Sequence, residues 1–433
     1  MPIRRISTAD EDVAAFVSSK KADLDEITEG VAGIGREVKA RGDQAVFEFT
    51  RQFDGALITG ENFKVGPDEI DQAYALVDAE YLDALRAAID NIRAFHTRQL
   101  KNSWIEPDEH GNILGQIIRP VERAGIYVPG GTAAYPSSVL MNAIPAKVAG
   151  VKEIVMVSPP DREGRLNPHT LVAAAELGIE EIYKMGGAQA IFALARGTQT
   201  VKKVDLITGP GNIYVTVAKK LVYGEVNIDM LAGPSEITII ADRSADPAYL
   251  AADMLSQAEH DVLARSILVT DDRELIDRVE AEISKQVKTL TRRRIIEQAL
   301  EGHGAFIFTS DLEEACRVVN LIAPEHLELM VEKPFELLSK IKNAGAIFLG
   351  AYTPEPVGDY YAGPNHILPT GGTARFYSPV TVNTFMKTSS LLYYSREGIM
   401  RDADAIIKLA MVEGLTAHAN SVRIRKEKAN GGS

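Results

Sequence analysis

The sequence predicts an α/β protein built from two lobes of related architecture. Between residues 124 and 242, short apolar runs alternate with helix-like segments, and several runs end in a glycine turn. A similar rhythm returns around the apolar runs 266–270, 305–309 and 346–349. Strands that alternate with helices at this spacing predict a parallel, doubly wound sheet. The length of 433 residues also favours two lobes over a single core.

The first 120 residues precede this α/β pattern. Residues 27–51 and 67–96 carry apolar side chains at helical spacing, which predicts helices. Residues 104–105 and 113–118 are predicted strands, joined by a turn at His110-Gly111-Asn112.

The elements of the first α/β region follow in strict alternation. The predicted strands are 125–128, 153–157, 182–185 and 206–208. The predicted helices are 139–148, 171–177, 189–195 and 215–222. The second region adds predicted helices at 275–287 and 312–319, and the chain ends with a helical segment that includes 402–413.

Composition narrows the class of protein. The net charge of −13 argues against nucleic acid as a partner, because phosphate binding needs clustered Lys and Arg. It is compatible with a small cationic substrate. No run approaches the ~20 apolar residues of a membrane span, and residues 1–12 lack the apolar core of a signal peptide. The single cysteine, Cys316, lies in a predicted helix and favours a reducing, cytoplasmic location.

Three glycine turns stand between a predicted strand and a predicted helix, at Gly130, Gly186 and Gly209. Such turns let backbone N–H groups approach a phosphate at the positive end of a helix. None of them spells G-x-G-x-x-G, so their spacing alone leaves tight structural turns as the more frequent explanation.

Two groups of polar residues are candidates for chemistry. Asp253, Gln257 and His260 share one face of a predicted helix, so they are either metal ligands or a solvated polar face. Glu325 and His326 follow a proline and form a possible acid/base pair. Adjacent side chains in a regular strand point to opposite faces, so both reach one cleft only if the proline holds them in a loop.

Two segments near the C-terminus add further candidates. The segment 352–373 is predicted to be a long loop and contains Asp359, Tyr360, Tyr361, Asn365 and His366. Long polar loops of this kind are usually functional. His418 follows the final predicted helix, where a histidine is more often a helix-end cation than a ligand.

Taken together, these segments resemble the histidinol dehydrogenase family. The matching motifs are GIYVPGG at 125–131, GPGN at 209–212 with AGPSE at 232–236, SQAEH at 256–260, APEH at 323–326, VGDYYAGPNH at 357–366 and EGLTAH at 413–418. They stand in the family's order and span the chain from about residue 27 to 425, which makes the resemblance far more specific than any glycine turn.

The resemblance implies a metal site and a reaction. Gln257, His260, Asp359 and His418 match the family's zinc ligands, with one Zn²⁺ per subunit that mainly orients the substrate. The implied reaction is the NAD-dependent oxidation of L-histidinol to L-histidine through histidinaldehyde, by two hydride transfers, at the end of histidine biosynthesis. His326 matches the base, and Glu325 matches the group that activates water.

The resemblance also assigns binding residues. Tyr127, Gln189 and Asn212 match positions that hold NAD. The substrate-contacting positions are Ser235, Gln257, His260, His326, Asp359, His366, Glu413 and His418.

The fold implied by the family is two similar, incomplete Rossmann-like lobes, aldehyde-dehydrogenase-like, with helical N- and C-terminal extensions. Placed on this chain, residues 1–25 form the N-terminal extension, 26–124 plus 238–380 the first lobe, 125–237 the second, NAD-binding lobe, and 381–433 a helical extension for dimerisation. Two chains would interlock in a homodimer, with Glu413 and His418 reaching the partner's active site.

Three other functions compete with this one. A related dehydrogenase for another hydroxylated molecule would have less need of His366 and Glu413. A zinc hydrolase using Glu325 to activate water would have no use for the glycine turns. A metal-binding structural protein would leave the Glu325–His326 pair unexplained.

Overall fold

The computed structural model describes residues 3–9, 13, 16, 25–130 and 134–430. The chain forms two compact units, which are described separately below. Unit 1 comprises residues Met1–Gln99 and Val121–Phe385, and unit 2 comprises Leu100–Pro120 and Met386–Ser433. Most of the predicted N-terminal extension, and Gly131 of the first glycine turn, lie outside the described residues.

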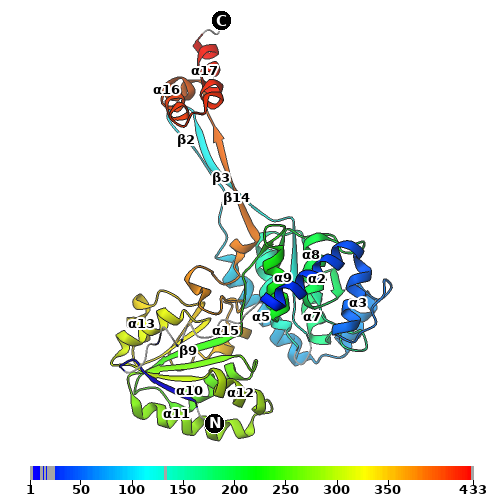
Figure 1. The fold of residues 1–433 in the computed structure, drawn as a ribbon, viewed down its shortest axis with the longest axis vertical. Coiled ribbons are helices and arrows are strands. Elements are labelled where there is room, and N and C mark those ends of the chain that lie inside the picture. Colours follow the sequence, from blue (N-terminus) through cyan, green and yellow to red (C-terminus); the bar gives the residue numbers. More distant parts are fainter. Residues whose placement is uncertain (1–2, 10–12, 14–15, 17–24, 131–133, 431–433) are drawn as a thin grey trace. The chain divides into compact units, whose positions relative to one another are not determined.

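The described part of unit 1 contains two parallel sheets, which confirms the predicted α/β class (Figure 1). The first sheet has the order β6-β5-β4-β7-β8. Its strands are β4 (Arg123–Tyr127), β5 (Glu153–Ser158), β6 (Glu181–Lys184), β7 (Leu206–Thr208) and β8 (Asn227–Ile228). Between them run α6 (Pro136–Ala149), α7 (Pro168–Glu176), α8 (Gly187–Arg196) and α9 (Ile213–Val222).

The second sheet has the order β1-β11-β10-β9-β12-β13. Its strands are β1 (Arg4–Ser7), β9 (Glu236–Ala241), β10 (Arg265–Thr270), β11 (Ala305–Phe308), β12 (His326–Met330) and β13 (Ala346–Leu349). The accompanying helices are α10 (Pro247–Ala258), α11 (Arg273–Gln286), α12 (Arg293–His303), α13 (Leu312–Ile322), α14 (Pro334–Leu337) and α15 (Glu355–Tyr360). Every residue of β4, β9 and β12 is buried, as expected for parallel strands covered by helices on both faces.

The N-terminal helices pack on the first sheet's helices. These are α2 (Asp25–Arg41), α3 (Asp43–Phe53), α4 (Pro67–Ala75) and α5 (Ala79–Thr97). α2 packs on α8 and α9, α3 on α8, α4 on α7 and α5 on α6. From the sequence, residues 26–124 were predicted to belong to the same lobe as residues 238–380, and not to the lobe of the first sheet. The helices lie here because their apolar stripes, including Val31, Val38 and Val46, join the core that contains Phe192 and Leu194.

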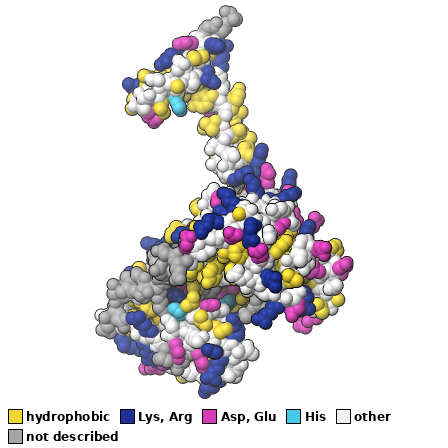
Figure 2. All heavy atoms as spheres, turned by 45° about the vertical axis from the view of Figure 1, so that its right-hand side comes forward, with side chains coloured by type: hydrophobic (Ala, Val, Ile, Leu, Met, Phe, Trp, Pro, Cys, Tyr) yellow, Lys and Arg dark blue, Asp and Glu magenta, His cyan; other side chains and the backbone are white. Residues whose placement is uncertain are grey.

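Unit 2 contains the predicted hairpin, extended by one more strand. β2 (Trp104–Pro107) and β14 (Met386–Tyr393) both pair antiparallel with β3 (Ile113–Pro120). Figure 1 shows these three strands side by side, followed by α16 (Arg396–Val412) and α17 (Thr416–Asn430), which pack on each other. Such a thin unit leaves large apolar side chains in solvent, as Figure 2 shows along the strands. Leu392, Leu409 and Val412 are about 70% exposed.

Within the described residues, no helix combines the length and the apolar character that crossing a membrane requires.

Candidate active site

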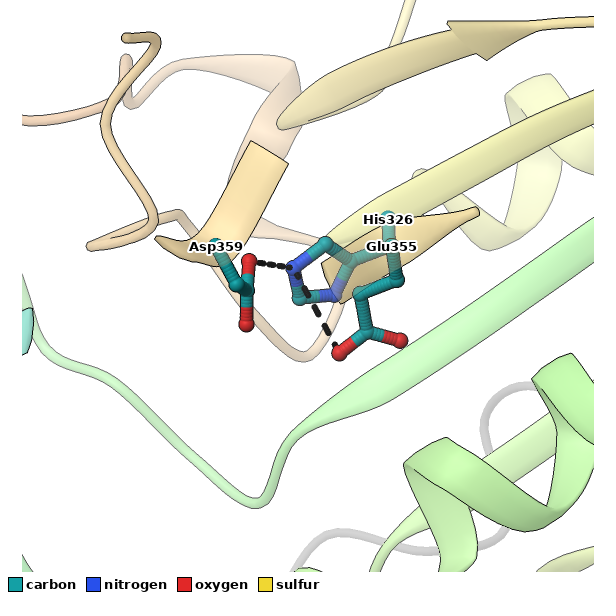
Figure 3. Close-up of side chains that lie close together, drawn as sticks. All are labelled: His326, Glu355 and Asp359. Carbon is teal, nitrogen blue, oxygen red and sulfur yellow. Dashed lines mark ion pairs between the residues drawn. The ribbon is translucent and has the colours of Figure 1, made fainter. Parts of the chain in front are cut away.

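A cluster of an imidazole and two carboxylates lies where β12 begins, and Figure 3 shows its three members. His326 is the first residue of β12, whereas Glu355 and Asp359 come from α15. The Nε2 atom of His326 lies 3.5 Å from Asp359 Oδ1 and 3.9 Å from Glu355 Oε1. One donor atom from each residue falls within 4.8 Å of the others, a spacing that suits a metal ion.

Glu355 is a site residue that the sequence analysis missed. It lies in the predicted loop 352–373, where the structure instead has the short helix α15. Glu355 and Asp359 are four residues apart, so they share one face of this helix. A local pattern for this helix was present, because Pro354 and Pro356 flank Glu355 and proline is favoured at the start of a helix.

The predicted ligands Gln257 and His260 meet this cluster from the end of α10. With its amide oriented to satisfy hydrogen bonding, Gln257 donates from its side-chain nitrogen to Glu355 Oε2 at 2.9 Å. That orientation turns the amide oxygen, which is the donor a metal would use, away from Glu355. His260 Nε2 lies 4.0 Å from Glu355 Oε1. The structure therefore gathers Gln257, His260 and Asp359 around Glu355 and His326.

The main chain of Glu236 binds both members of the predicted acid/base pair, Glu325 and His326. Its N–H donates to Glu325 Oε2 at 2.8 Å, and its carbonyl lies 3.2 Å from His326 Nδ1. A carbonyl only accepts, so Nδ1 carries the hydrogen and Nε2 is left facing the carboxylates. Ala323 has a φ of 52°, which turns the chain sharply after α13. Glu325 thus precedes the strand, and both side chains reach one place, 3.7 Å apart.

Burial and neighbouring charges shift the pKa values of His326 and Asp359 in opposite directions. Burial lowers the pKa of His326, but the carboxylates of Glu355, Glu325 and Asp359 outweigh it and raise that pKa well above its ordinary value. Burial raises the pKa of Glu355 to about 7 and that of Glu325 to about 8. The pKa of Asp359 is lowered despite its burial, because it bonds to His326 and faces further imidazoles. The site is thus a buried cluster of carboxylates around one imidazole, and Glu355 and Glu325 exchange protons near neutral pH.

Four further predicted substrate-contacting residues lie in different places. His366 is close to the cluster, because its Nδ1 lies 3.0 Å from the Asp359 carbonyl, and burial lowers its pKa. Ser235 directly precedes Glu236 and β9. Glu413 directly follows α16 as its C-cap and His418 lies in α17, so both belong to unit 2 and their place at the site stays a prediction.

The three residues predicted to hold NAD lie at the carboxyl-end edge of the first sheet. Tyr127 ends β4, and its hydroxyl accepts from the Gly187 N–H at 3.1 Å. Gln189, in the first turn of α8, is fully buried, and neither of its side-chain polar atoms has a partner among the described residues. Asn212 caps α9 by accepting from Tyr214 N and Val215 N, both at 3.1 Å, which leaves its NH₂ group available.

A cavity of about 460 Å³ opens at the same edge of this sheet. Pro129, Gly130, Ser158 and Pro159 line one side, and the start of α7 lines another. Parallel α/β sheets bind ligands at this edge. A side chain at Gly130 or Gly186 would come within 3 Å of Pro159, so these two glycines also serve close packing.

The two sites carry donors that fit the implied groups. The imidazole of His326 and the carboxylates of Glu355 and Asp359 converge on one point, and groups of these kinds are suitable ligands for Zn²⁺. The orphaned amide of Gln189 needs a polar partner that a dinucleotide would supply.

Comparison with known proteins identifies the family. A family model described as histidinol dehydrogenase matches residues 17–426. Histidinol dehydrogenase of Heliobacterium mobile is 58% identical over 426 residues, covering 98% of this chain and all of the relative. The Bacillus subtilis (strain 168) relative is 52% identical, covering 99% of both chains. A crystal structure of histidinol dehydrogenase from Elizabethkingia anophelis is 39% identical and superposes with a TM-score of 0.92 over 99% of both chains. The chain belongs to the histidinol dehydrogenase family.

Proposed function

We propose that this enzyme oxidises L-histidinol to L-histidine in the cytoplasm, using two NAD⁺ and one water and releasing two NADH and three protons. Family membership supports the substrate. The observation that carries the proposal is the gathering of Glu325 and His326 beside Gln257, His260 and Asp359. An acid/base pair next to a metal-binding set is what a two-step oxidation of an alcohol requires.

The metal would be held by Gln257, His260 and Asp359, with His418 of a second subunit as the fourth ligand. Glu355 would orient one of these ligands. It accepts a hydrogen bond from the side-chain nitrogen of Gln257, which leaves the amide oxygen of Gln257 free for the metal. A bound Zn²⁺ would act as a Lewis acid that holds the imidazole and amine of the substrate. The carboxylates of Glu355 and Asp359 would favour both the metal and the cationic substrate.

His326 is the proposed base. The alcohol must lose its hydroxyl proton while its C–H hydride leaves for NAD⁺. The Nδ1–H of His326 is held by the Glu236 carbonyl, so Nε2 is the atom that accepts the proton. The carboxylates that raise the pKa of His326 are also those that bound cations would neutralise. Their neutralisation favours the neutral imidazole that a base requires.

Glu325 is proposed to act in the second step. The aldehyde is hydrated before its second hydride leaves, so one water must lose a proton. With a pKa of about 8, Glu325 can take up and release a proton near neutral pH. Ser235, His366 and Glu413 are proposed to contact the substrate.

NAD is proposed to bind at the carboxyl-end edge of the first sheet. Tyr127, Gln189 and Asn212 would hold it there. Tyr127 is buried, the Gln189 amide has no partner among the described residues, and Asn212 uses only its side-chain oxygen to cap α9. NAD supplies hydride acceptance in both steps, whereas the protein supplies orientation.

We also propose that two chains form a homodimer with shared active sites. Unit 2 exposes a set of large apolar side chains that a second subunit would cover. These are Ile105, Leu114, Leu392, Tyr393, Leu409 and Val412. Glu413 and His418 belong to this unit, so its docking onto a partner would deliver both residues to that partner's site.

The test is to count NADH formed per histidinol consumed, with and without added zinc. Two NADH per substrate, lost on chelation, is the expected result. Glu325→Gln should reduce turnover by roughly 10²–10⁴-fold, whereas the exposed Glu313→Gln serves as the matched control. An absence of NADH would overturn the proposal and direct the search to other alcohols and then to ester or amide hydrolysis.

A further inference from the structure

A buried ion pair holds the third glycine turn of the chain, at Gly209. This residue links β7 to α9 with a φ of 118°. A side chain here would come within 2.1 Å of the Tyr127 carbonyl oxygen, so only glycine fits. The Gly209 N–H donates to Asp229 Oδ2 at 2.8 Å, and its carbonyl accepts from Lys219 Nζ at 3.0 Å.

Lys219 and Asp229 also bond to each other. Their side chains are only 3% and 1% exposed, and they form an ion pair. Asp229 Oδ1 accepts in addition from the Met230 N–H at 2.6 Å. Burying two charges is expensive, and such a pair can often be replaced by apolar side chains without loss of stability. Its presence at the Gly209 turn therefore suggests a role in geometry beyond stability.

The position of the lysine supports that role. A lysine beside a glycine turn commonly contacts a phosphate directly. The ammonium of Lys219 instead points inward and is occupied by the Gly209 carbonyl and Asp229. The polar groups that remain available for a ligand belong to the rest of the turn. The main one is the NH₂ group of Asn212 at the start of α9, because only the side-chain oxygen of Asn212 is used in capping.

We propose that Lys219 and Asp229 are positioning residues for the dinucleotide. They fix both polar groups of Gly209, which packs Gly209 against Tyr127 and sets the place of Asn212. The turn is thereby organised before the cofactor arrives, and its binding loses less conformational freedom. This inference rests on the proposed NAD site, because it gives the pair a function only if the turn binds NAD.

The decisive variant removes both charges together, as Lys219→Met with Asp229→Asn, so that neither charge is left alone in the interior. Its control is Arg123→Met with Glu181→Gln, which removes a partly buried ion pair, 2.7 Å apart, at the amino ends of β4 and β6; Arg123 also pairs there with Glu153. NADH affinity is measured by fluorescence titration without substrate, and the melting temperature and the KM values for NAD and histidinol are measured in parallel.

We expect the Lys219/Asp229 variant to raise the dissociation constant of NADH about ten- to hundredfold, with the KM for NAD rising equally and the KM for histidinol unchanged. The control variant should lose stability but bind NADH as the wild type does. A folded Lys219/Asp229 variant with wild-type affinity for NADH would overturn the inference. Failure of the wild type itself to bind NADH would overturn the proposed function instead.

A second variant covers the case in which the double substitution does not fold. Asp229→Glu keeps the charge and the ion pair but moves the carboxylate by one methylene relative to Gly209. We expect it to fold and to weaken NADH binding several-fold, with kcat nearly unchanged at saturating NAD. Unaltered NADH affinity in this variant would count equally against a positioning role.

Discussion

Glu328 is expected to control metal affinity without touching the metal. It lies two residues after His326 on β12, so both side chains are on the same face of the strand. Its Oε1 accepts from the Glu355 N–H at 3.0 Å, at the first residue of α15. Burial raises the pKa of both Glu328 and Asp253, so one of the two carboxyl groups can keep its proton and donate it to the other, and Asp253 lies one helical turn before Gln257 on α10. Glu328 therefore ties together the three elements that carry the proposed ligands and the base.

Replacing Glu328 by leucine would break both connections. The Glu355 N–H would be left buried without an acceptor, which costs about 1–3 kcal/mol. Groups that orient metal ligands typically change metal affinity by about 10–100-fold when removed. We expect a loss of zinc affinity in that range for Glu328→Leu. Glu328→Gln keeps an acceptor for Glu355 and a donor for Asp253, so it should remain close to wild type.

Competition with a chromophoric chelator measures the zinc affinity of each variant, and circular dichroism verifies folding. Glu314→Leu is the matched control, because it also removes a carboxylate that accepts a backbone N–H, from Ser310 at 2.7 Å, but on α13. A folded Glu328→Leu variant with wild-type zinc affinity would refute the reasoning. So would a glutamine variant as weak as the leucine variant, since the effect would then come from charge alone.

Three further predictions test the proposed metal, the shared site and a buried acid. Chelation should abolish turnover while leaving the far-ultraviolet circular dichroism spectrum largely unchanged; full activity in a sample shown to be metal-free would contradict the zinc assignment. A mixed dimer of His418→Ala and His260→Ala chains should recover one working site, so activity no better than that of either homodimer would contradict shared sites. Burial raises the pKa of Asp54 to about 6, so its ionisation destabilises the fold as pH rises from about 4 through 6. Asp54→Asn should therefore raise the melting temperature at pH 8 but not at pH 4, and an equal gain at both would show that ionisation is not the cause.

Most strands of the two sheets were predicted, because burial on two faces leaves a simple apolar pattern, but β8, β9 and β12 were missed. β5 and β10 each carry an unbroken apolar run, 154–157 and 267–269, and each is followed by a turn-forming residue, so their positions follow from the sequence. The hairpin at 110–112 was also predictable, because Gly111 has a φ of 72° and supplies the turn. Such features depend on residues that are close together in the sequence, so a single sequence is enough to predict them.

The partner of an amphipathic helix was not predictable in the same way. The apolar stripe of α2 shows that one face is buried, but it does not show which lobe buries it, and the packing on α8 and α9 became visible only in the structure. The short edge strand β1 was missed for a related reason, because four residues carry too little periodicity. The predicted zinc ligands came from the family resemblance, whereas spacing alone left a solvated polar face as an alternative for Gln257 and His260.

The Glu325–His326 pair shows why neighbours in sequence do not specify a site by themselves. Strand alternation would send the two side chains to opposite faces. The structure avoids this because Ala323 adopts a positive φ, so that β12 begins only at His326. One peptide group of β9 then binds both partners, through the Glu236 N–H and carbonyl. Because main-chain atoms set this geometry, substitutions of the Glu236 side chain should alter the acid/base pair only indirectly, through Arg265 and the Gly371 N–H that it binds.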